Sequence, residues 1–415
     1  MRRSNLLSPG HFPFKGRLLR QNAPRSDIPM DFVKALFDIV SLYAHLEEIE
    51  DTRKAKGKRH QLITLLILML LAKLGGEDRP SGIAEWIANR KEIWVEHKIL
   101  GKPKTASHMT YRRVLQTIIS AETFEKLMQK YHLTRLKEEQ ELVVSIDGKT
   151  VRGTIPYGAC RGVHLLAVYV PGQGLVLAQA EVDKKENEIV VAPKILSQVL
   201  LAGMIVIADA MHTQRAFSEQ IVAAGASYVL TAKDNQPRTK WAIQKLFVHE
   251  VCNLQKGALV SADVRMATTT NKRHGRLEQR TIMCSTQLND YLEWPHVAQV
   301  FRIERVVHHA HGKGKTKQIV YGLTSLKPQE AGPEKLLALF REYWNIENGL
   351  HYRRDVTFRE DSTRLTVGDA GHNMATLNNL AIGLCLQNGY QNIARARRLF
   401  QAQPKVALDL ITKKD

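Results

Sequence analysis

Cysteine is scarce in this sequence. Its four cysteines are Cys160, Cys252, Cys284 and Cys385, and no two of them lie close enough to form a CxxC pair. Disulfide frameworks and zinc knuckles both depend on closely spaced cysteines. The spacing therefore argues against a disulfide framework and against a zinc knuckle. It predicts a protein of a reducing compartment.

Long hydrophobic runs are also missing. The longest, from Leu62 to Ala72, is much shorter than the ~20 apolar residues that a membrane-spanning helix needs, so it predicts a buried helix. No apolar stretch follows Arg2 and Arg3, so no signal peptide is predicted. The sequence contains neither a GxxxxGK[ST] loop nor a GxSxG elbow, which argues against P-loop ATP chemistry and a hydrolase serine.

Acidic residues are in deficit. Lys and Arg number 60 against 41 Asp and Glu, which leaves a formal net charge of +19. Such an excess attracts polyanions, and nucleic acid gains further because each neutralised phosphate releases a condensed counterion. The charge therefore predicts a nucleic-acid partner and no membrane, although a basic soluble protein with no such partner would share the same composition.

The chain of 415 residues has 44% hydrophobic residues, enough for two or three domains with ordinary cores. Residues 1–29 are basic and aperiodic, and they predict a disordered tail or an extension ahead of a start at Met30. Residues 30–136 have helical periodicity and predict an all-helical N-terminal domain. Residues 391–415 are predicted to form a basic C-terminal tail.

The composition changes to an α/β pattern over residues 137–390. Three apolar strands are followed by helix, strand, helix and strand, which predicts a mixed sheet with flanking helices. Residues 237–330 contain short β-like runs separated by polar loops, and 308–317 predict a hairpin tip. From Pro333 to Leu386 the pattern is mostly helical again.

Two aspartates end apolar strands of this predicted sheet. Asp147 closes a β-branched run and precedes Gly148, and Asp209 closes the run Ile205 to Ala208. Strand ends are where open α/β sheets place chemistry, and a carboxylate there is costly unless it is paired or bound to a metal. Each aspartate alone could be a simple turn residue; together they indicate a site.

A third acid, Glu347, lies on a predicted helix. Arg354 is seven residues further on and therefore on nearly the same face, with Tyr343 and His351 one turn to either side. An amphipathic surface helix would need no function for these residues. Glu360 and Asp361 are alternatives to Glu347 as the third acid.

Three carboxylates from two strands and one helix suit two Mg²⁺ ions, because hard cations prefer oxygen ligands. Mn²⁺ is expected to substitute. Asp147 would bridge both ions, while Asp209 and Glu347 would each hold one. Such a pair can activate an attacking oxygen and stabilise a leaving one.

Six stretches resemble, in order along the chain, the DDE transposases of bacterial insertion sequences, and within them the group that includes the H-repeat-associated proteins. They are SIDGKTVRGT at 145–154, KKENEI at 184–189, IVIADAMHTQ at 205–214, YVLTAKDNQP at 228–237, HGRLEQR at 274–280 and YWNIENGLHYRRDVTFRED at 343–361. The flanking helices fit as well, so the resemblance covers most of the chain.

The resemblance implies a ribonuclease H-like core interrupted by a β-rich insertion between Asp209 and Glu347, and an N-terminal domain that helps to bind the element's ends. It also implies double-stranded DNA as partner, a homodimer in the DNA complex and a cytoplasmic, nucleoid-associated protein. Related transposases often carry Tyr, Arg, Glu and Lys at fixed spacing on the last helix. Here Phe340 and Tyr343 occupy the first two places, and Arg354 replaces the Lys.

Further DNA contacts are predicted at basic and polar positions around the motifs, although a solvated side chain would explain each of them equally well. They are Lys149, Arg152, Lys233, His274, Arg276, Tyr343, His351 and Arg354. Arg354 could clamp a phosphate with two parallel hydrogen bonds. Three functions stay open: a transposase that hydrolyses and joins DNA, a decayed or domesticated copy that only binds DNA, and a nuclease that cuts without joining.

Overall fold

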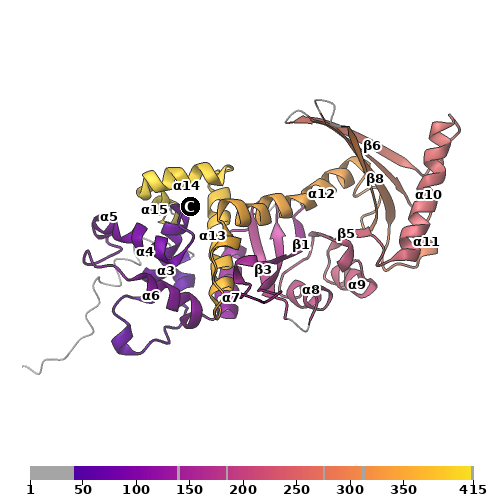
Figure 1. Cartoon of the computed structure of the whole chain (residues 1–415). Helices are drawn as coiled ribbons and strands as arrows, with labels where there is room; N and C mark the ends of the chain where they lie inside the picture. Colours follow the sequence, from indigo (N-terminus) through magenta and orange to yellow (C-terminus); the bar gives the residue numbers. More distant parts are fainter. Residues whose placement is uncertain (1–41, 138–140, 184–185, 274–275, 310–313, 413–415) are drawn as a thin grey trace, which may run out of the picture.

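The computed structural model describes residues 42–137, 141–183, 186–273, 276–309 and 314–412. Residues 1–41, including the predicted tail and the Met30 start, lie outside them. Figure 1 shows three parts side by side, with helices at one end, a sheet in the middle, and a long antiparallel ribbon with α10 at the other end. No helix in the described ranges is long and apolar enough to cross a membrane.

The N-terminal part is helical, as predicted. Its elements are α2 (Leu42–Glu47), α3 (Leu62–Leu74), α4 (Pro80–Ala88), α5 (Lys91–Glu96), α6 (His108–Arg113) with the π-helical turn η2 (Val114–Ile118), and α7 (Ala121–Thr134). The apolar run predicted as a buried helix forms α3, whose residues from Leu65 to Leu74 are all buried. A helix that is apolar all round needs neighbours on every side.

The C-terminal helices supply some of those neighbours. They are α13 (Ala370–Gln387), α14 (Ile393–Ala402) and α15 (Pro404–Thr412), and they share one hydrophobic core with the N-terminal helices. The segment predicted as a basic tail therefore differs from that expectation. Phe400 and Ala407 are fully buried in this core on the apolar faces of two amphipathic helices, and Arg397 of α14 is buried as well, paired with Asp78.

The central sheet is mixed. Its strands are β1 (Val143–Thr150), β2 (His164–Val170), β3 (Leu175–Glu181), β4 (Ile205–Ala208) and β5 (Ser227–Ala232), in the order β3-β2-β1-β4-β5. β1, β4 and β5 are parallel, whereas β2 is antiparallel to both its neighbours. Helices α8 (Glu188–Leu196) and α9 (Arg215–Ala223) connect the strands, which confirms the predicted α/β order.

Residues 237–330 are more regular than the sequence indicated. They begin with the long helix α10 (Pro237–Gln255), continue with β6 (Arg265–Arg273), β7 (Arg276–Ser285) and α11 (Asn289–Leu292), and end with β8 (Gln299–His309) and β9 (Lys315–Thr324). β9 pairs antiparallel with β5, so the nine strands within the described ranges form one continuous sheet. The predicted hairpin at 308–317 joins β8 to β9; its residues 310–313 lie outside the described ranges.

Two helical layers cover the sheet. α8, α9 and α10 pack on one face, and α12 (Pro333–Ile346), α13 and α7 pack on the other. The alternation of side chains along each strand assigns them to these faces. In β1, Val144 and Ile146 contribute to the core beneath α8 and α9, so Ser145, Asp147 and Lys149 face α12.

Candidate active site

The two aspartates predicted at strand ends are neighbours across the sheet. Asp209 directly follows β4, as predicted, whereas Asp147 lies inside β1, which continues to Thr150 because it stays paired with β2. β1 and β4 pair in parallel, with Ile146 opposite Ala208, so Asp147 and Asp209 occupy the next register position on adjacent strands. Adjacent strands lie about 4.8 Å apart. Both aspartates follow a residue that faces the α8–α9 core, and the alternation therefore places both on the side of α12.

Helix α12 crosses this sheet edge and ends in the π-helical turn η5 (Glu347–His351). The turn brings Glu347 and His351 to Asp147. The His351 Nδ1 atom lies 3.5 Å from Asp147 Oδ2 and 3.3 Å from Glu347 Oε2. Ligand atoms of these three residues all lie within 4.8 Å of one another. π-helical turns are frequent at functional sites because they shift side chains out of the α-helical register.

The electrostatics of the two carboxylates differ. Burial raises the pKa of Asp147, and the negative charges of Glu188 and Glu347 raise it further against the opposing effect of His351. The hydrogen bond with His351 lowers the pKa of Glu347, which is largely exposed. Asp147 is thus a carboxylate in a poorly solvated position, and a cation there would be strongly attracted.

Tyr343, a partly buried residue of α12, is influenced by the charges of the same site. Burial raises the pKa of its hydroxyl, and the charges of Asp147, Asp209, Glu188 and Glu347 raise it further. Tyr343 therefore shares the electrostatic environment of these carboxylates.

Asp209 is held by its own turn. It caps the short 3₁₀ helix η4 (Ala210–His212), where its Oδ1 atom accepts a hydrogen bond of 3.0 Å from the Met211 backbone N–H. Lys233 Nζ lies 3.7 Å from Asp209 Oδ2, which places this predicted DNA contact beside a predicted metal ligand. Asp209 does not belong to the cluster that Asp147, Glu347 and His351 form in the described structure.

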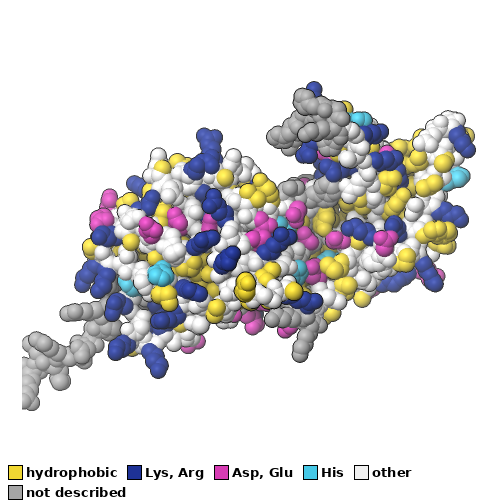
Figure 2. Space-filling model, viewed as in Figure 1, with side chains coloured by type: hydrophobic (Ala, Val, Ile, Leu, Met, Phe, Trp, Pro, Cys, Tyr) yellow, Lys and Arg dark blue, Asp and Glu magenta, His cyan; other side chains and the backbone are white. Residues whose placement is uncertain are grey.

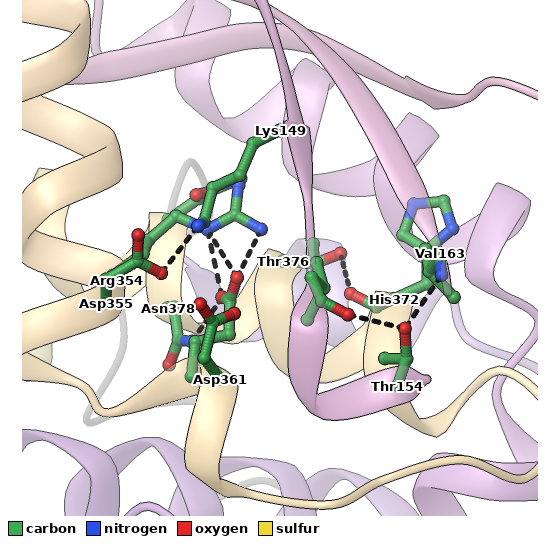
Figure 3. Close-up of polar contacts among 12 residues, drawn as sticks. Lys149, Thr154, Val163, Arg354, Asp355, Asp361, His372, Thr376 and Asn378 are labelled. Carbon is green, nitrogen blue, oxygen red and sulfur yellow. Dashed lines mark hydrogen bonds and ion pairs between the residues drawn. The ribbon is translucent and has the colours of Figure 1, made fainter. Parts of the chain in front are cut away.

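Two of the predicted DNA contacts are paired inside the protein. Lys149 is 8% exposed, and its Nζ atom lies 2.5 Å from Asp355 Oδ1. Arg354 is fully buried and donates to Glu360 from Nε and Nη2, at 2.9 and 2.8 Å (Figure 3). A phosphate cannot reach the Arg354 guanidinium in this arrangement.

Glu360 and Asp361, the alternatives to Glu347, have structural partners. Glu360 is buried with Arg354, and Asn378 Nδ2 donates to its Oε2 atom at 2.7 Å. Asp361 Oδ1 accepts from the backbone N–H of Arg152 at 2.9 Å. Neither carboxylate belongs to the cluster around Asp147.

Two further predicted contacts, Arg152 and Arg276, lie on the surface. The Arg152 and Arg276 side chains are exposed, and Arg276 lies at the start of β7, in the distant ribbon. His274 lies outside the described residues. Figure 2 shows Asp and Glu side chains gathered near the middle of the molecule, with Lys and Arg distributed around them.

Sequence reasoning missed a buried group behind the sheet edge. The Glu188 carboxylate, at the start of α8, lies 2.8 Å from His164 Nε2 and 3.3 Å from His212 Nε2. Despite its burial, the hydrogen bond with His164 and the nearby His212 imidazole lower the pKa of Glu188 to about 2. A Cβ atom at Gly148 would lie only 2.3 Å from Glu188 Oε1, so Glu188 fills the space behind Gly148. Glu188 lies in the KKENEI stretch, and this motif could have indicated it as a residue of the site.

Comparison with known proteins decides the family. A sequence model described as "Transposase DDE domain" matches residues 138–384, and a model described as "DDE_Tnp_1-associated" matches residues 43–132. The chain belongs to the DDE transposase family. The resemblance deduced from the six motifs is thus confirmed.

Relatives of this transposase include proteins of Escherichia coli (strain K12). The "Putative protein YbfL" is 28% identical over 84% of this chain and 90% of its own length. The "H repeat-associated putative transposase YhhI" is 27% identical over 84% and 90% of the two chains. A protein in the dhlA 3′ region of Xanthobacter autotrophicus is 32% identical over 60% of this chain and 80% of its own.

Among solved structures, the cryo-EM structure of the piggyBac transposase synaptic complex with hairpin DNA aligns with a TM-score of 0.41 at 10% identity. The alignment covers 94% of this chain and 82% of that one. A likeness of this size carries no argument about the site of this transposase.

Proposed function

We propose that this transposase hydrolyses a phosphodiester bond at each end of an insertion sequence and then joins the freed 3′ ends to a target strand. The observation that carries the proposal is the approach of Asp147 and Glu347, 200 positions apart along the chain, to one point at the sheet edge. Asp209 closes the adjacent strand and completes a set of three acids.

The strand order supports a ribonuclease H-like core. Three antiparallel strands are followed by two parallel ones in the order β3-β2-β1-β4-β5; Asp147 lies in the second half of β1, and Asp209 follows β4. We assign residues 137–390 to the catalytic domain, with an insertion at about 237–330. Residues 30–136 are assigned to binding of the element ends.

The donor set fits divalent cations. Asp147 and Glu347 offer carboxylate oxygens within 4.8 Å of each other, and burial makes Asp147 expensive to ionise without a counter-charge. Two Mg²⁺ ions, replaceable by Mn²⁺, would activate the attacking oxygen and stabilise the leaving one. Asp147 would contact both ions, and Asp209 and Glu347 one each.

The remaining residues of the site position the DNA. Lys233, 61% exposed beside Asp209, would contact a phosphate next to the scissile one. Tyr343 would donate its hydroxyl proton toward the phosphate, because its neutral form is favoured by the surrounding carboxylates. Arg152 and Arg276 are exposed and available for contacts along the duplex backbone.

The partner is double-stranded DNA, both at the element ends and at the target. The net charge of +19 favours it, and binding is expected to weaken steeply with salt. Two ends must be held together for joining, so we propose a homodimer in the DNA complex, and a nucleoid-associated protein in the cytoplasm.

The test is cleavage of a DNA duplex that carries an end of the element, with Mg²⁺ or Mn²⁺. Asp147→Asn, Asp209→Asn and Glu347→Gln should each lower the cleavage rate by ~10³-fold or more, with DNA affinity retained. Asp409→Asn, a matched change of an exposed aspartate on α15, should leave the rate unchanged. Parental rates in all three site variants would refute the assignment.

The same assay separates the alternatives. A protein that only binds DNA would shift the labelled duplex without cutting it. A nuclease would release cut ends but no joined product. Only a strand-transfer product, seen when a target duplex is added, identifies the transposase.

A further inference from the structure

His351 is buried beside two carboxylates, whereas a residue that only contacts DNA would be exposed. It ends the π-helical turn η5 and is 4% exposed, and the preceding Leu350 is fully buried. Its Nδ1 atom points between two carboxylates, at 3.5 Å from Asp147 Oδ2 and 3.3 Å from Glu347 Oε2. The imidazole therefore lies where a cation shared by those carboxylates would be bound.

The spacing of these atoms matches the coordination shell of one ion. First-row metal ions bind imidazole nitrogen and carboxylate oxygen at ~2.1 Å, so two ligands of one ion lie ~3.0 Å apart at a right angle and ~3.4 Å apart at the tetrahedral angle. The measured separations of 3.3 and 3.5 Å are close to these values. A modest movement of the exposed Glu347 side chain would complete the shell.

The other ring nitrogen, Nε2, has no hydrogen-bonding contact in the described ranges that would prevent Nδ1 from binding a cation. The Nε2 atom is buried and has no hydrogen-bond partner among the described residues. Among the described residues, it is the Glu347 carboxylate, as acceptor from Nδ1, that favours a proton on this atom. The hydrogen bond from Nδ1 to Glu347 stabilises the pair when no cation is bound, and a cation would replace that proton.

We propose that His351 Nδ1 is a ligand of the metal ion held between Asp147 and Glu347. This inference rests on the proposed function and deepens it, because it assigns one of the two ions a nitrogen ligand. Imidazole suits Mn²⁺, Co²⁺ and Zn²⁺ better than Mg²⁺, which prefers an all-oxygen shell. The site should therefore favour Mn²⁺ over Mg²⁺ by a larger factor than three carboxylates alone would.

The decisive experiment is pulsed electron paramagnetic resonance of Mn²⁺ bound to the full chain without DNA. A directly bound imidazole gives a ¹⁴N hyperfine coupling, and growth with ¹⁵N-histidine should convert it to the ¹⁵N pattern. This readout uses the parent protein, so it does not depend on the folding of a variant. A Mn²⁺ spectrum with no histidine-nitrogen coupling would overturn the proposal.

Variants add an affinity readout. His351→Ala should remove the coupling, weaken Mn²⁺ binding by at least ~10-fold in calorimetric titration, and weaken Mg²⁺ binding less. His249→Gln, at a histidine whose side chain is 73% exposed on α10, should change neither. Equal losses for Mn²⁺ and Mg²⁺ in a folded His351→Ala protein would contradict a nitrogen ligand.

The outcomes also distinguish this inference from the proposed function. If Asp147→Asn and Glu347→Gln abolish Mn²⁺ binding while the parent spectrum lacks nitrogen coupling, the carboxylate site stands and only the role of His351 is wrong. If both carboxylate variants bind Mn²⁺ as the parent does, the metal site of the proposed function fails as well.

Discussion

Arg354 and Glu360 form a buried ion pair in which the guanidinium Nε and Nη2 atoms both donate to one carboxylate, at 2.9 and 2.8 Å (Figure 3). Gln179 accepts a further hydrogen bond from the guanidinium Nη1 at 3.3 Å, and Asn378 donates to Glu360. The pair thus connects the π-helical turn η6 (Arg353–Thr357) to β3 and α13. Burial of both partners makes it a structural element rather than a surface contact.

Removal of one partner should be costly. We expect Arg354→Met to lower the free energy of unfolding by about 3–5 kcal/mol, because it leaves the Glu360 carboxylate buried without its counter-charge. The Arg354→Met/Glu360→Leu double variant should recover much of that loss. The measurement is urea denaturation followed by circular dichroism. A folded Arg354→Met protein of parental stability that no longer binds DNA would instead indicate a phosphate clamp.

Gly148 should tolerate no side chain. In Gly148→Ala the new Cβ atom would lie 2.3 Å from Glu188 Oε1, and His164 and His212 hold that carboxylate in place. We expect a loss of about 1–3 kcal/mol in stability, typical of overpacking. A displaced β1 end should also reduce cleavage, because Asp147 is the adjacent residue.

The control for this prediction is Gly172→Ala. Gly172 has no atom within 4 Å of the added Cβ position, so this change should be neutral or slightly stabilising. Glu188→Ala should partly rescue Gly148→Ala, and a double-mutant cycle measures the coupling. Additive effects of the two changes would mean that Gly148 and Glu188 do not touch.

His372 should make the free energy of unfolding fall as the pH becomes alkaline. It lies on α13, with Nε2 3.4 Å from Glu125 of α7 and Nδ1 3.7 Å from Glu181 of β3. Although burial opposes its charge, the two nearby carboxylates raise the pKa of His372 to about 9. The raised pKa means that its contribution is fully present below the unfolded value of about 6.5 and is lost as pH rises through 9.

We therefore expect the free energy of unfolding of the parent to fall by about 1–3 kcal/mol more than that of His372→Gln between pH 6.5 and 10. Thermal or urea denaturation across this range measures the difference. His249→Gln, which changes an exposed histidine, should keep the parental slope. Parallel pH profiles for the parent and His372→Gln would refute the role of this histidine in joining α7 to the sheet.

Asp147→Asn should stabilise the metal-free protein. The pKa of Asp147 is raised, chiefly by burial, so above that pKa its ionisation in the folded state opposes folding. The amide removes this charge at similar size, and the melting temperature with a chelator present should rise at neutral pH. Mn²⁺ should raise the melting temperature of the parent and have little effect on Asp147→Asn. A lower melting temperature for metal-free Asp147→Asn would show that the carboxylate is already compensated by the protein.

The sequence by itself determined the elements and the strand-end acids. Alternating and continuous apolar runs predicted β1 to β5 with their intervening helices. Asp147 and Asp209 were recognised because each follows an apolar run, where a carboxylate is costly unless it is paired or bound to a metal. These features are local, since they depend on periodicity within a few residues, and local patterns can be read without knowing what lies across the core.

Only the tertiary structure decided which charged groups are buried with one another. Arg354 and Glu347 share a helical face in the sequence pattern, yet Arg354 is enclosed with Glu360, whereas Glu347 and His351 approach Asp147. The basic composition of the C-terminal segment predicted a tail, whereas α14 and α15 pack into the core. No local pattern indicated that Glu188 contacts His164 and His212. Such contacts join residues far apart in the chain, and their partners are fixed by how the helices pack on the sheet rather than by the composition of either segment.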